Sequence, residues 1–377
     1  MPRLTTEQEE FRRSVAKLVD TEIAPVADDI DARGELPPAL FRRLGGLGYF
    51  GLRYPERYGG SEADMVTFCL LAEELGRGSM SLAAAAMMQA LMGTHFVFKY
   101  GDEEQRQRYL VPALRGEKIG TFALTEPGAG SDLGNMQTRA RRDGDHWVLS
   151  GAKTWVTSAP IADFLTVGAK TSDERGLKHI ALFLVDPKTM PGVVLGKKIA
   201  KMSVRASETG EIALADVRVP ASHVLGGESG GVEKIGGILS EIRVMTAALS
   251  LGLARAAYDA ALRYARERVA FGKPIAEHQA IAFKLADMLT GIHGATLMTY
   301  AAAAALDRGE AVTREAAMAK LTASEMAVRV ADEATRIFAS YSLATEYPVQ
   351  RYLRDSRFLL FGGGTSEILR MIIARDL

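Results

Sequence analysis

The sequence predicts an α+β protein in which a helical N-terminal domain, a central β domain and a C-terminal helical bundle follow one another. Apolar residues recur at helical spacing before residue 120 and again after residue 230. Between them lie short strand-like runs with turn residues and no intervening helices. We therefore expect an N-terminal helical domain over 1–120, an antiparallel β-barrel or small sandwich over 121–225, and a bundle over 226–377. A chain of 377 residues is long enough for two or three such domains.

The first domain is predicted to be helical throughout. Apolar side chains repeat with the helical period over 5–33, and Pro37-Pro38 opens a short helix at its first turn, where proline is tolerated. The stretch 65–92, rich in alanine and methionine, predicts a further helix divided at Gly76-Arg77-Gly78. The stretch 102–114 predicts one more.

The middle and last domains differ in their periods. Strand-like runs occupy 147–149, 164–167, 180–185, 193–195 and 211–219. Because no helical stretch separates these strands, a parallel dinucleotide-binding sheet is not expected. Long helical runs then cover 231–268, 278–307 and 313–345, with shorter helices from Pro348 and over 365–374. Their short connections are typical of a bundle.

Composition excludes several kinds of partner and site. The 46 basic and 46 acidic residues give no net charge, which argues against nucleic acid or an acidic membrane as a partner. Cys69 is the single cysteine, so no intramolecular disulfide can form. The six histidines have no zinc-ligand spacing, and we expect no metal. We also expect no signal peptide, no apolar run of membrane-spanning length and a cytoplasmic protein.

Two polar stretches in the middle domain carry the chemistry. In Phe122–Asp132, Pro127 fixes one backbone angle, and glycines allow a ligand to approach the chain closely. Such a loop can direct backbone N–H groups and hydroxyls at a ligand that holds negative charge. In Ser150–Ser158, Trp155 offers a flat face for stacking and Thr157 a further hydroxyl.

Three later stretches follow in order: Arg266–Ile275, then Glu277-His278-Gln279, then Gly364-Thr365-Ser366-Glu367-Ile368. Together with the two loops they resemble the acyl-CoA dehydrogenase family of flavoenzymes, over essentially the whole chain. The resemblance implies FAD between barrel and bundle, a homotetramer or dimer of dimers, and a role in fatty acid metabolism. It also implies an acyl-CoA or acyl-carrier thioester as substrate and an electron-transferring flavoprotein as partner.

The resemblance assigns roles to individual residues. Those expected to bind FAD are Phe122, Leu124, Thr125, Gly130, Ser131, Trp155, Val156, Thr157, Arg268, Phe271, Gln279, Arg336, Ser340, Thr365 and Glu367. Those expected to border the substrate are Ser131, Ser240, Ile242, Arg243, Gly363 and Gly364. Arg336–Ser340 departs from the family pattern Gln-x-x-Gly-Gly, and Arg336 is expected to pair with the pyrophosphate instead.

A second departure concerns the catalytic base. In the family, a carboxylate removes the proton next to the thioester carbonyl while flavin takes hydride from the next carbon. The usual place of that carboxylate is Gly363 here. In members such as isovaleryl-CoA dehydrogenase it is the place just before Arg243, which is Ile242 here. Glu241 is the nearest carboxylate and our candidate base, although one helical step turns it by about 100°.

Three hypotheses follow. The chain is a dehydrogenase with a displaced base, or a catalytically incomplete subunit of a hetero-oligomeric acyl-CoA dehydrogenase, or a non-redox acyl-CoA lyase of the desulfinase type. A flavin monooxygenase is a weaker fourth. An acidic substrate would need a cation deep in the pocket, and Ala83–Met88 offers none, which argues against the lyase. The dehydrogenase is favoured because Thr365-Ser366-Glu367, the flavin loop and Arg243 are all intact.

Overall fold

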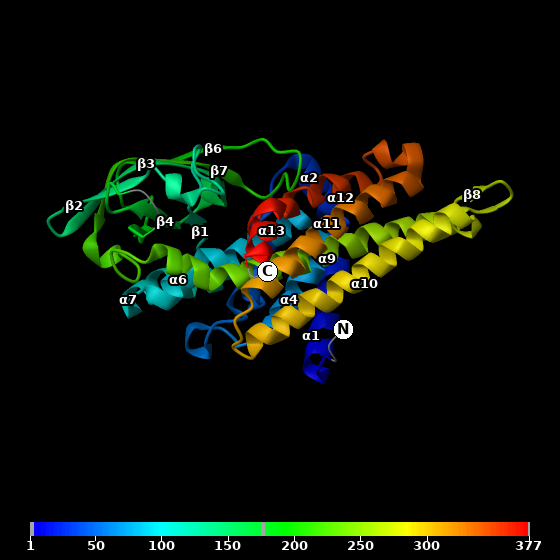
Figure 1. Ribbon diagram of the computed structural model, residues 1–377, viewed down its shortest axis with the longest axis horizontal. Coiled ribbons are helices and arrows are strands. Elements are labelled where there is room, and N and C mark those ends of the chain that lie inside the picture. The colour runs from blue at the N-terminus through cyan, green and yellow to red at the C-terminus, as the bar shows by residue number, and fades with distance from the viewer. Residues whose placement is uncertain (1–3, 175–177, 376–377) are drawn as a thin grey trace.

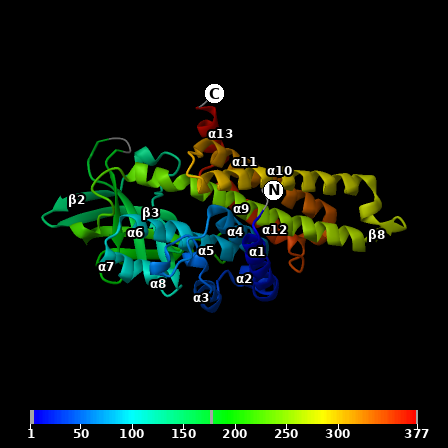
Figure 2. The same cartoon turned by 90° about the horizontal axis from the view of Figure 1, so that it is seen from below.

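A computed structural model describes residues 4–174 and 178–375, and shows the three expected regions (Figure 1). The β domain lies at one end of an elongated molecule, and the long helices of the bundle extend to the other end (Figures 1 and 2). The N-terminal helices are α1 (Thr6–Leu18), α2 (Ala27–Arg33), α3 (Pro38–Gly46), α4 (Met65–Gly78), α5 (Met80–Met87), α6 (Gly93–Tyr100), α7 (Glu103–Gln105) and α8 (Val111–Leu114).

Capping residues explain where the main N-terminal helices begin. Thr5 accepts a hydrogen bond from the Gln8 N–H, and the Gln8 side chain accepts one from the Thr5 N–H, so that α1 opens on a capping box. The helix expected over 65–92 is divided, because Ser79 is extended and caps α5. A π-helical turn, Met88–Met92, then joins α5 to α6.

The middle domain is a single curled sheet of seven strands. They are β1 (Gly120–Ala123), β2 (Arg139–Asp143), β3 (His146–Thr157), β4 (Phe164–Lys170), β5 (Ile180–Val185), β6 (Val193–Lys198) and β7 (Thr209–Pro220), in the order β1-β4-β2-β3-β7-β6 with β5 also on β4. Antiparallel pairings predominate, as expected. The two parallel pairings, β1 with β4 and β2 with β4, were not expected from the sequence.

The bundle follows the predicted helices closely. Its helices are α9 (Gly231–Glu267), α10 (Gln279–Asp307), α11 (Thr313–Phe338), α12 (Val349–Ser356) and α13 (Ser366–Ala374), and a hairpin of β8 (Val269–Ala270) and β9 (Lys273–Pro274) joins α9 to α10. The run expected over 313–345 ends at Phe338, because Ala339 leaves the helix with φ of 52°.

The N-terminal helices and the bundle share one hydrophobic core, and the barrel has a second core of its own. Helix α9 packs against both α4 and α11. At the α4–α9 crossing, a Cβ on Gly252 would lie 1.9 Å from the Glu73 carbonyl oxygen, so only glycine allows this approach.

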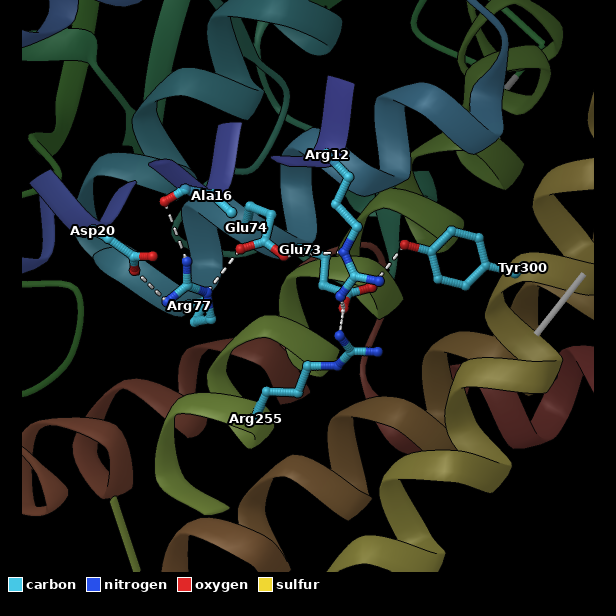
Figure 3. A network of polar contacts seen from close by, with 8 residues as sticks. All are labelled: Arg12, Ala16, Asp20, Glu73, Glu74, Arg77, Arg255 and Tyr300. Atoms are coloured by element: carbon cyan, nitrogen blue, oxygen red, sulfur yellow. Dashed lines mark hydrogen bonds and ion pairs between the residues drawn. The ribbon is translucent and has the colours of Figure 1, made fainter. Parts of the chain in front are cut away.

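A buried polar network fastens the same crossing (Figure 3). Glu73 of α4 pairs with Arg255 of α9 at 2.8 Å and accepts a hydrogen bond from the Tyr300 hydroxyl of α10 at 2.7 Å. Arg12 of α1 contacts both Glu73 and Glu74. The Glu73 carboxylate therefore joins four helices, and each charged side chain of the network has a partner of opposite charge.

Contrary to expectation, two helical stretches are long and apolar enough to span a membrane. They are Met80–Tyr100 and Gly231–Glu267, and their apolar windows are 83% and 78% buried inside the protein. Such burial is typical of core helices of a globular domain.

Candidate active site

The barrel presents one exposed aromatic face beside the glycine loop. The pairing of β3 with β7 shifts register between Lys153 and Val156, and this bulge turns Trp155 outward with φ of 57° and 60% exposure. The Thr154 N–H donates to the Thr125 carbonyl at 2.9 Å, which fixes the loop against the strand. The residue before Trp155 is therefore tied to Thr125, and the resemblance places both Trp155 and Thr125 at the flavin.

A buried ion pair, not predicted from the sequence, holds this loop in place. Lys153 Nζ lies 2.8 Å from Glu126 and also donates to the Leu124 carbonyl at 3.1 Å. Glu126 accepts two further bonds, from the N–H groups of Gln137 and Thr138. Burial lowers the pKa of Lys153 to about 8. Burial by itself raises the pKa of Glu126, but Lys153 and the hydrogen bonds together hold it below its usual value.

The other barrel residues expected at the flavin differ in how far they are buried. Gly130 and Ser131 are exposed, while Phe122 and Leu124 are half-buried. Val156 is buried in the barrel core, so only its backbone can face a cofactor. The Thr157 carbonyl is held by the Thr121 hydroxyl.

Gly363 and Ile242, the two positions at which the resemblance places the base, face the same space. Gly363 has φ of 73°, and a Cβ built on it would lie 3.5 Å from Ile242 Cγ2 and 3.7 Å from Thr246 Oγ1. These are ordinary van der Waals distances, so a side chain at 363 would point at the stretch Ile242–Thr246 of α9. Since neither residue is acidic, this space has no carboxylate from either usual position.

Arg243 borders that space as a buried cation. It is 5% exposed, and its Nε donates to the Gly363 carbonyl at 3.3 Å. Among the residues that the structure describes, no carboxylate forms an ion pair with it. Burial lowers the pKa of Arg243, and no neighbouring charge opposes this effect. A buried guanidinium without a counter-ion is a binding site for an anion.

Glu241 is turned to a different neighbour. Its carboxylate forms an ion pair with Arg53, which also contacts the Met65 sulfur at 3.4 Å. Both side chains are between a fifth and a quarter exposed. Arg53 follows α3 in the chain and belongs to no motif, so sequence reasoning could not pair it with Glu241. The Nε of Arg53 is buried and has no hydrogen-bond partner in the described part of the chain.

A second buried cation, Lys320 of α11, also contacts the glycine turn. Its Nζ donates to the carbonyls of Leu360 and Gly364, at 3.1 and 2.9 Å. After the turn, Thr365 caps α13 by accepting from the Ile368 N–H, and Glu367 is exposed. Sequence reasoning missed Lys320, because only the fold brings it to this turn.

The remaining FAD residues lie at the other end of the molecule. Arg268 ends α9, and Phe271 at the tip of the β8–β9 hairpin is 96% exposed (Figure 1). Gln279 begins α10. Arg268 lies 25 residues beyond Arg243, or about 38 Å along the helix. The structure therefore does not bring the two groups of expected FAD residues together within one chain.

The segment Arg336–Ser340 lies at this far end as well, since the Arg268 guanidinium stands 5.8 Å from the ring centre of Tyr341. Arg336, expected to pair with pyrophosphate, pairs with Asp332 at 2.7 Å and remains exposed. Ser340 is exposed in the 3₁₀ turn Ala339–Leu343. Among the described residues, no group of three potential ligands could hold a metal ion.

Family models match nearly the whole chain. They are the acyl-CoA dehydrogenase N-terminal domain over residues 5–117, the middle domain over 121–217 and the C-terminal domain over 229–377. Benzylmalonyl-CoA dehydrogenase of Aromatoleum aromaticum is 50% identical, over 99% of this chain and 98% of that protein.

Solved structures agree with this match. Butyryl-CoA dehydrogenase from Megasphaera elsdenii superposes with a TM-score of 0.96 at 35% identity, over 99% of this chain and 98% of the other. An FAD complex of PigA superposes with a TM-score of 0.96 at 28% identity, over 99% of this chain and 98% of the other.

Proposed function

The chain belongs to the acyl-CoA dehydrogenase family, and from that premise we propose that it oxidises and decarboxylates an acyl-CoA that carries a carboxylate on its α-carbon. As a member of this family it is an FAD-dependent oxidoreductase that acts on a CH–CH bond. The finer assignment depends on one observation, which is that Gly363 and Ile242 leave the usual base position without a carboxylate.

Loss of carbon dioxide supplies the electron pair that a base would otherwise release. The bond between the α-carbon and its carboxylate breaks, CO₂ leaves, and the electron pair stays on the α-carbon as an enolate. The α,β double bond forms as a hydride leaves the β-carbon, and FAD, when bound, would supply the acceptor for that hydride. The substrate anion thus gives one enoyl-CoA, one CO₂ and one hydride, so no proton acceptor is needed.

The space and the charge around Gly363 fit such a substrate. A carboxylate on the α-carbon would occupy the space that a glutamate at 363 or 242 would fill, bordered by Thr246. Arg243 offers the buried positive charge that an anion requires. An acidic substrate requires a cation in the pocket. The segment Ala83–Met88 has none, and Arg243 provides it.

The enolate oxygen also has candidate donors at the same place. The N–H groups of Gly363 and Gly364 make no hydrogen bond within the described residues. Donors held in place before the reaction stabilise a developing oxyanion more than water does, because they need no reorganisation. We assign the thioester carbonyl to this turn.

The similarity to benzylmalonyl-CoA dehydrogenase supports the substrate class. A malonyl thioester has a carboxylate on the carbon next to its carbonyl, which is the arrangement that an empty base position needs. Small residues at Ala83–Ala86 leave room for a bulky group on the β-carbon. An arylalkyl group is therefore the first to test.

The cofactor site is completed by a second copy of this chain. When bound, FAD accepts the hydride. Trp155 and the Thr125 loop would hold its ring, and Arg268, Phe271 and Gln279 of another copy would hold the rest. The separation of these groups within one chain supports a homotetramer or dimer of dimers. We expect a cytoplasmic enzyme that passes electrons to an electron-transferring flavoprotein.

Glu241 as a displaced base is the alternative within this chain. Its ion pair with Arg53 argues for another task, because the carboxylate is already engaged by that guanidinium. A hetero-oligomeric partner that supplies the base is the second alternative, and a desulfinase-like lyase the third. In the hetero-oligomer as in the lyase, the buried Arg243 would bind an acidic substrate.

Anaerobic mixing of the purified flavoprotein with paired substrates tests the proposal. One member of the pair is an arylalkylmalonyl-CoA, and the other is the same acyl-CoA without the carboxylate. We expect the flavin to bleach with the first alone, with one CO₂ released per flavin reduced. Bleaching by the second that disappears in Glu241→Gln would replace our proposal with the displaced base. Release of CO₂ without bleaching would indicate a non-redox enzyme.

A further inference from the structure

Lys320 is a fully buried lysine that no sequence motif points to. It is 0% exposed, and its Nζ donates to two backbone carbonyls, those of Leu360 and Gly364. No carboxylate within the described part of the chain forms an ion pair with it. Burying a charge without a counter-charge costs free energy, so this arrangement calls for a reason beyond packing.

The local sequence of the turn that Lys320 binds does not by itself select one backbone conformation. Phe361-Gly362-Gly363-Gly364 contains three glycines in succession, and the last two have φ of 73° and 108°. Glycine loses more backbone freedom on folding than any other residue. The local sequence therefore leaves many conformations open, and tertiary contacts must select one.

Two buried cations select the backbone conformation of the glycine turn by binding its carbonyl groups. Lys320 binds a carbonyl on each side of the turn, and Arg243 binds the Gly363 carbonyl between them. Three carbonyl groups within five residues are thus directed at positive charges. The N–H groups of Gly363 and Gly364 remain available for a ligand.

We infer that Lys320 is a positioning residue, which fixes both ends of the glycine turn so that the turn's N–H groups are aimed at the thioester carbonyl. This inference rests on the proposed position of the thioester carbonyl, and not on the loss of CO₂. The positive charge of Lys320 in a buried site also favours the negative charge that develops on the enolate oxygen.

The charged groups around Lys320 give the inference a pH signature. Glu325 of the same helix and Glu367 of α13 raise its pKa, and Arg243 of α9 lowers it. Burial is the largest effect, and the pKa of Lys320 is lowered to about 8. As the pH rises through about 8, the lysine loses its charge and holds the two carbonyls less strongly. We expect the rate of flavin bleaching to fall over this range.

Lys320→Met tests the assignment, because methionine keeps the unbranched side chain up to the position of Cε and removes the donors. Lys201→Met is the matched control. Lys201 is half-buried, its Nζ donates to the Ser207 carbonyl at 2.6 Å, and burial lowers its pKa to about 8 as well. We expect Lys320→Met to slow the limiting bleaching rate roughly 10- to 100-fold, the range expected for a misplaced catalytic geometry.

In the same variant, the decline above about pH 8 should disappear, while Lys201→Met keeps both the rate and the decline. Lys320→Arg keeps the charge and should recover part of the rate. A Lys320→Met protein with full FAD content, the wild-type rate and the wild-type pH profile would overturn the inference. If that variant does not fold, Lys320→Gln replaces it, and a wild-type profile there has the same meaning.

The measurement uses whichever acyl-CoA bleaches the wild-type flavin. If only the acyl-CoA without a carboxylate does so, the decarboxylation proposal fails. The comparison of Lys320 variants then proceeds unchanged, because the thioester carbonyl is common to both substrates.

Discussion

Single side chains decide the chemistry of this pocket, and Gly363 is the most informative of them. Its missing side chain leaves Arg243 without the carboxylate that a glutamate at 363 or 242 would place beside it. Sequence alone identified both vacant positions and the nearby arginine. It could not show that the two vacancies are one space, since 121 residues separate them along the chain.

Ile242→Glu should restore a base to this space. The residue lies within α9, so the substitution avoids the left-handed backbone of Gly363. We expect oxidation of the plain acyl-CoA to rise about 100-fold or more, the usual contribution of a general base. Oxidation of the 2-carboxyacyl-CoA should fall, because two carboxylates would compete for Arg243.

Stopped-flow bleaching with both substrates measures this exchange. Ile242→Gln is the control, since it has the same size but cannot accept a proton at neutral pH. Equal gains in both variants would mean that shape, and not basicity, limits the reaction.

Glu126 should make the flavin loop sensitive to acid. Its pKa is held below the usual 4.5, so its contribution to stability is complete at neutral pH. That contribution is lost as the pH falls below 4.5 through the lower folded value. Glu126→Gln should therefore lower the free energy of unfolding at pH 7, and by less at low pH. Denaturant unfolding followed by tryptophan fluorescence at several pH values measures it, and a constant difference between the proteins would contradict it.

At the scale of elements, the helical period predicted the bounds of α9 and α10 to within one residue but extended α11 seven residues beyond Phe338. It could not predict which helices meet, because periodicity defines a face but not its partner. The α4–α9 crossing depends on Gly252 and on the Glu73 network, whose members lie on four helices far apart in sequence (Figure 3). The parallel pairing of β1 with β4 could not be predicted either, because the strand period does not identify the partner strand.

Two glycines of α9 should respond oppositely to alanine. A methyl group on Gly252 would meet the Glu73 carbonyl at 1.9 Å, and we expect Gly252→Ala to destabilise the protein by about 3 kcal/mol. Gly236 has no atom within 4 Å of its would-be Cβ. Gly236→Ala should stabilise the protein by about 1 kcal/mol through helix propensity. Thermal unfolding of both variants checks the pair, and equal shifts would contradict the close crossing.

At the scale of the whole molecule, the residues expected at the flavin include a barrel group and a hairpin group at opposite ends (Figures 1 and 2). Sequence reasoning named members of both groups without distances, so it could not show that they lie at opposite ends of the folded chain. The exposed Phe271 at the hairpin tip is consistent with a surface that another copy covers.

Complementation tests this arrangement. Arg268→Ala should bind FAD more weakly, and Arg243→Met should bind FAD but turn over poorly. Refolding a mixture of the two should regain activity, because some sites would then combine an intact Arg243 from one copy with an intact Arg268 from another. Each variant refolded alone is the control. A mixture no more active than the two controls would mean that each chain builds its own site.

The glycine turn affects how this activity can change by mutation. Glycine and glutamate codons can differ by one nucleotide, whereas an isoleucine codon needs at least two changes to encode glutamate. The left-handed backbone at Gly363 opposes the shorter mutational route, since a residue with a Cβ costs roughly 1–2 kcal/mol there. Populations grown on a saturated, uncarboxylated acid should therefore reach this codon first, and then gain second-site changes that relax the turn.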